Sequence, residues 1–133
     1  MKLQYLIDQI EPEIVACADY PVFVLEDISE NKEASEFQEY DVLDIEIEEK
    51  DPEINLITNQ NGNKEGKGLT LSALFSSLNS LLPQHREYSL FSGSAKQYVD
   101  KTHWVRLDVP LIALGWDHKG RHFGLVQQKS KKK

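Results

Sequence analysis

The sequence predicts an α+β fold in which two tandem α-β-β-β units, related by internal duplication, form one compact domain with two helices and antiparallel hairpins. Apolar residues recur at helical spacing near the start of the chain and again 68 residues later. The short apolar strand pattern that follows the first helix has a counterpart at the same distance. Two longer segments typical of hairpins then match when one residue is inserted, so four elements keep nearly constant spacing.

The helices are predicted near residues 3–18 and 71–82. Pro12 lies inside the first helix, where it removes a hydrogen bond, so we expect a kink or a restart there. Thr70 is placed as the N-cap of the second helix, and Pro83 ends it.

The strands of the first unit are expected near residues 21–25 and in a hairpin near 42–58; those of the second are expected near 88–92, 103–109 and 111–127. Pro110 cannot donate to a ladder, so we expect the chain to bend or to reach a sheet edge there. Acids alternate with apolar residues in the first hairpin, which is typical of a strand with one solvent-facing side. In the second hairpin Leu111, Ala113 and Gly115 replace those acids, so we expect a more deeply buried strand, covered by neighbouring elements or by a partner chain.

A chain of 133 residues has an ordinary size for one domain. We place the first unit at 1–61, a linker at 62–69, the second unit at 70–128 and a disordered basic tail at 129–133. The linker contains "GNKEGKGLT", which matches a phosphate-binding loop only in part, because its glycine spacing is short and Gly68 replaces the required hydroxyl.

We expect a cytoplasmic location without membrane association. Cys17 is the only cysteine, which excludes an intrachain disulfide. The first residues lack the apolar core of a signal peptide, and no apolar segment is long enough for a membrane helix. The spacing of Cys17 along the first helix predicts a buried, inert thiol rather than a nucleophile.

Charge is divided unevenly along the chain. Residues 1–66 carry 18 acids and 4 bases, whereas residues 67–133 carry 4 acids and 11 bases. The segment from residue 26 to residue 53 holds 13 of the acids, and it is either a solvated face or a docking surface for a basic partner. The candidate partner-binding residues are Glu26, Asp27, Glu30, Asp44, Glu46 and Glu48.

The second half offers an alternative ligand pocket, which combines aromatic, basic and imidazole side chains. Its candidate residues are Trp104, Arg106, Trp116, His118 and His122. Asp117, His118 and His122 include possible metal ligands, but on a hairpin their spacing does not align them, so we predict no metal site. The chain shows no nucleophile motif, so we predict neither catalytic residues nor a cofactor.

Three functions follow from these patterns. The leading hypothesis is a non-catalytic interaction protein that binds a basic macromolecular partner through its acidic face, as an inhibitor, antitoxin, immunity protein or adaptor would. The alternative is a small-ligand-binding protein or enzyme with a site in the second half. The third, nucleic-acid binding by the basic half, is opposed by the net charge of −7. We also expect a homodimer, because an α-β-β-β unit leaves sheet edges that have to be paired, covered or charged.

Overall fold

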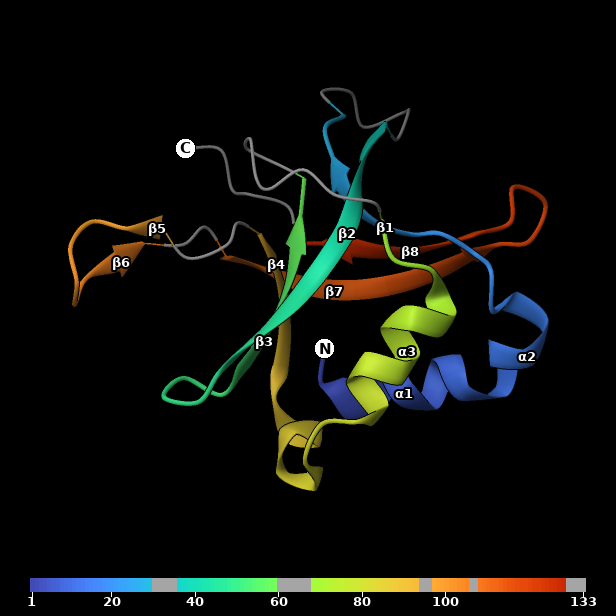
Figure 1. Cartoon of the computed structure of the whole chain (residues 1–133). Coiled ribbons are helices and arrows are strands. Elements are labelled where there is room, and N and C mark those ends of the chain that lie inside the picture. The colour runs from blue at the N-terminus through green and yellow to red at the C-terminus, as the bar shows by residue number, and fades with distance from the viewer. Residues whose placement is uncertain (30–35, 60–67, 94–96, 106–107, 129–133) are drawn as a thin grey trace.

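A computed structural model describes residues 1–29, 36–59, 68–93, 97–105 and 108–128 of the chain (Figure 1). The elements of the first half are α1 (Leu3–Ile10), a 3₁₀ turn (Glu11–Glu13), α2 (Ile14–Cys17), β1 (Val22–Asp27), β2 (Phe37–Glu48) and β3 (Glu53–Thr58). Those of the second half are α3 (Leu71–Asn79), a 3₁₀ helix (Pro83–Glu87), β4 (Ser89–Gly93), β5 (Gln97–Tyr98), β6 (Trp104–Val105), β7 (Asp108–Asp117) and β8 (His122–Gln127). The fold is mixed α+β.

Six strands close into a barrel in the order β1-β2-β3-β4-β7-β8, and β5 and β6 form a separate two-stranded sheet. Within each half, neighbouring barrel strands are antiparallel. The halves are joined by two parallel pairs, β3 with β4 and β8 with β1. The closed barrel was not predicted from the sequence. Every barrel strand has a neighbour on each side, so the sheet closes on itself, but β2 and β7 each pair with one neighbour along their first residues and with the other neighbour along the rest.

The strand pairings of the first half recur in the second half 68 or 69 positions later. The pair Phe23–Asp41 of the first half matches the pair Phe91–Pro110 of the second half. In the same way, the pair Lys2–Ser89 matches the pair Thr70–Pro21. A β-bulge interrupts β2 after Val42 and β7 after Leu111. The residue before α1 pairs with the first residue of β4, and the residue before α3 pairs with Pro21, directly before β1. Each helix therefore starts beside the other half.

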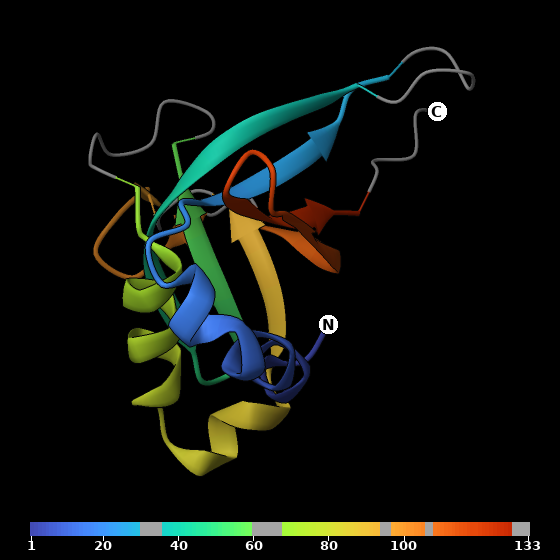
Figure 2. The same ribbon diagram turned by 90° about the vertical axis from the view of Figure 1, so that its right-hand side faces the viewer.

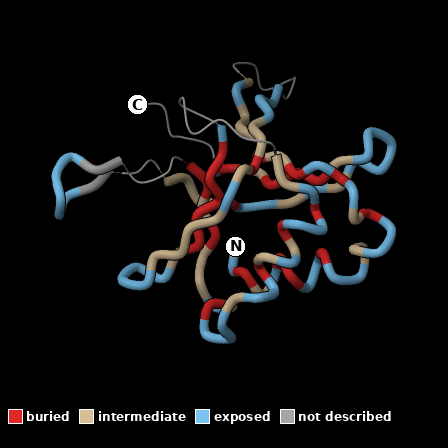
Figure 3. Tube along the Cα trace, in the orientation of Figure 1, coloured by how far each residue is buried: buried red, intermediate tan, exposed pale blue. Residues whose placement is uncertain are grey.

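One hydrophobic core joins the barrel to the helices. The buried residues of α1 are spaced as one helical face, and so are Leu71, Leu74 and Leu78 of α3. The two helices contact each other and lie side by side against the barrel (Figures 1 and 2). Buried positions are concentrated in the strands and on the inner sides of the helices (Figure 3).

The structure confirms two local predictions about the helices. The first helix is interrupted at Pro12, where the chain forms a 3₁₀ turn between α1 and α2. Thr70 caps α3, because its hydroxyl oxygen accepts a hydrogen bond of 3.2 Å from the amide of Ala73.

The prediction for Pro110 was correct in part: the ladder with β4 ends at this residue and a β-bulge follows at Leu111, but the residue is not excluded from the ladder. Pro110 lies within β7, pairs with Phe91 in the closed barrel and accepts a 2.8 Å hydrogen bond from the amide of Gln128. The corresponding residue of β2, Asp41, donates its amide to the side chain of Asn59. The ladder therefore makes no use of an N–H at this position, and a proline is tolerated.

Neighbouring elements do not bury the strand of the second hairpin more deeply, and burial by a partner chain stays a prediction. Leu111 is fully buried, but Ala113 and Gly115 are exposed and Ile112 is 57% exposed. The helices pack on the side of the sheet that carries Leu114 and Trp116, so they leave the outward side of β7 accessible.

Candidate functional site

Carboxylates follow the outward side of β2 along most of its length. Val42 and Ile45 point to the core, and because side chains alternate along a strand, the acids next to them point outward. The extra residue of the bulge after Val42 lets the acids before it and after it face the same side. We call the outward acids the acidic stripe: Glu39, Asp41, Asp44, Glu46 and Glu48. Glu39 and Asp44 are exposed, and the other three are half-buried.

Backbone and side-chain amides orient several of these carboxylates. Asp44 accepts a hydrogen bond of 2.8 Å from the backbone amide of Ile45, and Glu48 accepts one of 3.2 Å from the backbone amide of Lys50. The side-chain amide of Asn59 donates to Asp41 at 3.3 Å. An amide donor carries no net charge, so these bonds leave the negative charge of the carboxylates in place.

The other predicted partner-binding acids that the structure describes lie on β1, the strand paired with β2. Glu26 accepts a 3.1 Å hydrogen bond from the hydroxyl of Tyr40. Burial, together with this bond, raises the pKa of Tyr40. Asp27, at the end of β1, accepts a hydrogen bond of 2.9 Å from the backbone amide of Ser29. Glu30 lies outside the described residues. By the alternation of β1, Glu26 lies on the side of the buried Val24, whereas Asp27 lies on the outward side, two positions along from the Leu25–Glu39 pair.

Two residues of the alternative pocket, His118 and His122, lie apart from each other. The indole of Trp116 contacts the core residue Phe123, with ring centroids 4.6 Å apart, and stacks on His118 at 5.8 Å. Nδ1 of His118 lies 3.1 Å from the hydroxyl of Tyr20. His122 lies on the other side of the hairpin. Trp104 belongs to β6, of which only the backbone is described, and Arg106 is outside the described residues.

The tip between β7 and β8 is held against the chain segment before β1. Arg121 adopts a left-handed backbone conformation with φ of 58°. Its guanidinium forms an ion pair with Asp19 at 2.9 Å and lies 5.4 Å from the ring centroid of Tyr20. Asp117 accepts a 2.8 Å hydrogen bond from the amide of Gly120. His118 and Arg121 therefore have structural partners at this tip.

The tip between β2 and β3 is held in the same way. The hydroxyl of Tyr88 donates to Glu49 at 2.8 Å, and Nε2 of the buried His85 lies 2.9 Å from the same carboxyl group. Glu49 and Tyr88 occupy the positions that correspond to His118 and Tyr20 in the other half. The hydrogen bonds from Tyr88 and His85 lower the pKa of Glu49, and the hydrogen bond to Glu49 raises the pKa of Tyr88.

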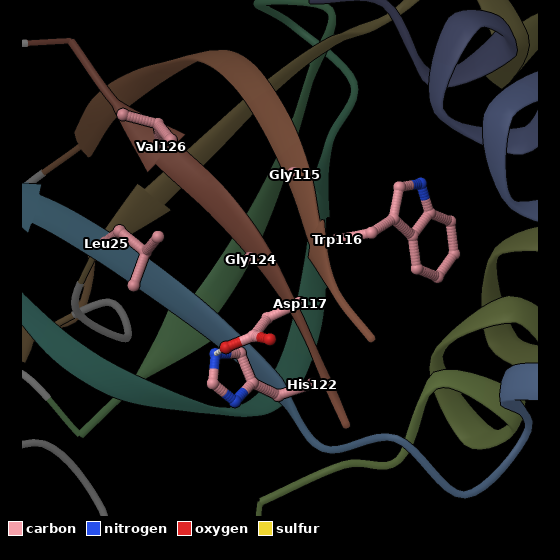
Figure 4. A pocket seen from close by; sticks show the side chains of 7 residues that line it. All are labelled: Leu25, Gly115, Trp116, Asp117, His122, Gly124 and Val126. Carbon is pink, nitrogen blue, oxygen red and sulfur yellow. Dashed lines mark ion pairs between the residues drawn. The ribbon is translucent and has the colours of Figure 1, made fainter. Parts of the chain in front are cut away.

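A hollow lies on the outward face of β1, β8 and β7. It has a volume of about 190 Å³ and is lined by Leu25, Gly115, Trp116, Asp117, His122, Gly124 and Val126 (Figure 4). The indole of Trp116 points away from it, toward the helices. Nε2 of His122 lies 3.3 Å from Asp117, and the imidazole packs edge-on against Phe23 with centroids 5.5 Å apart. We call this feature the outer hollow.

Sequence reasoning missed Glu39, Asp41 and the glycines of the hollow. A longer alternation beginning at Phe37 would have identified Glu39 and Asp41 as members of β2. Gly115 and Gly124 are paired across β7 and β8, which a single sequence does not indicate.

The described residues show neither a metal centre nor a membrane helix. Within the described ranges, no three His, Cys, Asp or Glu side chains lie close enough together to hold a metal ion. Cys17 is buried, as its spacing predicted. In the same part of the chain, no helix combines the length and the apolar character needed to cross a membrane.

Comparison of the chain with protein-family models, curated proteins and solved structures found no match.

Proposed function

We propose that this chain is a non-catalytic interaction protein that binds a basic protein partner through the acidic stripe. The observation that carries the proposal is the alignment of five carboxylates on the outward side of one strand. Successive outward residues of a strand are about 6.6 Å apart, so charges spread over this distance form an extended surface rather than a compact ion site. Such a surface favours encounter with a cationic partner and disfavours anionic ones.

The separation of the other candidate residues supports an interaction role over the alternatives. His118 packs between Trp116 and Tyr20, whereas His122 lies in the outer hollow, so the imidazoles do not converge on one substrate. Nucleic-acid binding through the second half is not part of the proposal, because the chain carries a net charge of −7 and Arg121 is paired with Asp19.

We infer that the two α-β-β-β units arose by duplication and then diverged at their surfaces. The recurrence of strand registers, β-bulges and tip contacts 68 or 69 positions later supports this origin. Glu46 and Glu48 of the stripe correspond to Gly115 and Asp117 in the second half. We therefore propose that only the first of the two units carries the binding surface.

We propose a cytoplasmic, single-domain protein of the kind that acts as an inhibitor, antitoxin, immunity protein or adaptor. A homodimer is not part of the proposal, because the closed barrel pairs within one chain the strand edges that motivated it.

The proposal is tested by affinity capture from cells of the source organism. A variant with Asp44→Lys, Glu46→Lys and Glu48→Lys should lose a basic protein that the wild type retains. The matched control, Asp8→Lys, Glu11→Lys and Glu13→Lys, changes the net charge equally at the first helix and should retain that protein. The proposal fails if the stripe variant still captures it, if both variants lose it, or if the bound species is a nucleic acid or a metabolite.

A further inference from the structure

The outer hollow results from a missing row of side chains on the barrel surface. Strand pairing places Leu25, Val126 and Ala113 in one row across β1, β8 and β7. Two residues further along each strand, at about 6.6 Å, the next row contains Phe23 and two glycines.

The row after that contains His122 and Asp117. The paired glycines, Gly124 and Gly115, thus form the floor of a trough between an apolar wall and a carboxylate–imidazole wall (Figure 4).

The local packing explains Gly124 but not Gly115. A Cβ atom at Gly124 would lie 2.8 Å from Cδ1 of Leu25, so a side chain there would require Leu25 to move. A Cβ atom at Gly115 would meet nothing within 4 Å. A glycine inside a strand destabilises it by roughly 0.5–1 kcal/mol relative to alanine. Where the strand neither bulges nor bends, such a glycine marks close approach by a ligand or another chain.

The other half of the barrel shows that the fold does not require glycines in this row. The pair that corresponds to Gly115 and Gly124 is Glu46 and Asn55, which have the same register across β2 and β3. Asn55 is fully buried there. The strand pair β2–β3 therefore accommodates larger polar side chains at both positions. The open floor in the second half is therefore a feature of its surface and not of its architecture.

The charge around the hollow indicates what it accepts. Asp117 lies at one side, and on the other side Glu39 pairs with Leu25 and Asp41 pairs with Phe23. The acidic stripe thus begins on β2, the strand paired with β1 at the edge of the hollow. An apolar group that enters the trough has carboxylates on both sides, which favours basic groups next to it.

We propose that the outer hollow binds an aliphatic side chain of the protein partner, a leucine or similar residue flanked by lysine or arginine. This inference rests on the proposed function, because it assigns the apolar anchor of the same basic partner. The side chain lies on the backbone of Gly115 and Gly124, against Leu25 and Val126. Apolar anchors that fill small pockets within a polar rim contribute most of the affinity of many interfaces.

The test uses synthetic peptides and the amide NMR spectrum of the full chain. The probe is Gly-Lys-Lys-Leu-Lys-Lys-Gly at millimolar concentration, compared with peptides that carry alanine at the centre or glutamate in place of lysine. The leucine peptide should shift the amides of Gly115, Gly124 and His122. Because burial of a leucine side chain accounts for about a tenfold change in affinity, the alanine peptide should bind about tenfold more weakly. The glutamate peptide should not bind.

Two variants separate the hollow from the stripe. Gly115→Val fills the trough at a position where its Cβ meets no other atom, so the chain should remain folded and lose about tenfold in affinity for the leucine peptide. Ser76→Val adds comparable bulk on the exposed side of α3 and should leave binding unchanged.

Each outcome decides between the two proposals. The hollow is excluded if no lysine peptide binds, if the shifts fall elsewhere, or if alanine and leucine peptides bind equally and Gly115→Val has no effect. If instead the variant with Asp44→Lys, Glu46→Lys and Glu48→Lys binds the leucine peptide as wild type does while Gly115→Val does not, the hollow stands, and the stripe is decided separately by whether the same variant loses the captured protein.

Discussion

Glu49, at the tip of the first hairpin, connects three segments that are distant in sequence. Its carboxylate accepts hydrogen bonds from Tyr88 and from the buried His85, and these bonds lower its pKa below the ordinary value of 4.5. Because the pKa is lower in the folded chain, the carboxylate stabilises the fold above pH 4.5 and loses this contribution as the pH falls through the folded-state value.

This linkage predicts a pH-dependent effect of Tyr88→Phe. At neutral pH the variant should unfold at a lower urea concentration than the wild type, because the hydroxyl no longer donates to the Glu49 carboxylate. The difference should shrink below pH 4.5 as Glu49 becomes protonated. Tyr5→Phe, at a side chain that is 52% exposed, serves as the control and should unfold as the wild type does. A difference for Tyr88→Phe that is constant between neutral and acidic pH would exclude this role for Glu49.

Single residues also show where sequence information ends. The spacing of Cys17 was sufficient to predict its burial, because a helical face depends only on local periodicity. The different environments of His118 and His122 were not predictable, because they depend on which side of the hairpin meets Tyr20 and which meets Phe23. Contacts of this kind join residues about a hundred positions apart in the chain.

Among the elements, α3 was the most predictable. Its apolar face, its N-cap and the proline that follows it are all local signals. β2 was predicted too short, because its first residues, from Phe37, lie within an acidic segment that resembles a loop by composition. The place of Pro110 inside a ladder was not predictable, because it depends on whether the partner strand needs an N–H at that position.

The cap of α3 gives a prediction at this scale. Thr70→Ala removes the hydroxyl that accepts from Ala73 and should lower the free energy of unfolding by about 1 kcal/mol. Thr70→Ser keeps the hydroxyl and should retain most of the stability. Urea unfolding of both variants checks this. An equal loss for serine and alanine would show that the methyl group of Thr70, rather than its hydrogen bond, stabilises the helix.

At the scale of the whole molecule, the closed barrel could not be predicted from the pattern of elements. Alternation indicated the hairpins, but closure depends on the parallel pairs β3–β4 and β8–β1, which carry no local signal. The same closure determines the candidate site, because it places β7 and β8 beside β1 and so brings the outer hollow next to the acidic stripe.

Charge is the other property of the whole molecule. The first half is strongly acidic, and the structure places five of its acids along β2. If this surface steers a basic partner, association has to weaken as salt screens the charges, since the screening length falls from about 10 Å at 0.1 M to about 3 Å at 1 M.

The most direct measurement is therefore the association rate constant of the wild-type chain with the captured partner, followed as a function of salt concentration. Between about 0.02 M and 0.5 M salt it should fall by about tenfold or more. The variant with Asp44→Lys, Glu46→Lys and Glu48→Lys should associate slowly at all salt concentrations. A rate constant that is independent of salt, or equal in the wild type and the variant, would contradict binding through the acidic stripe.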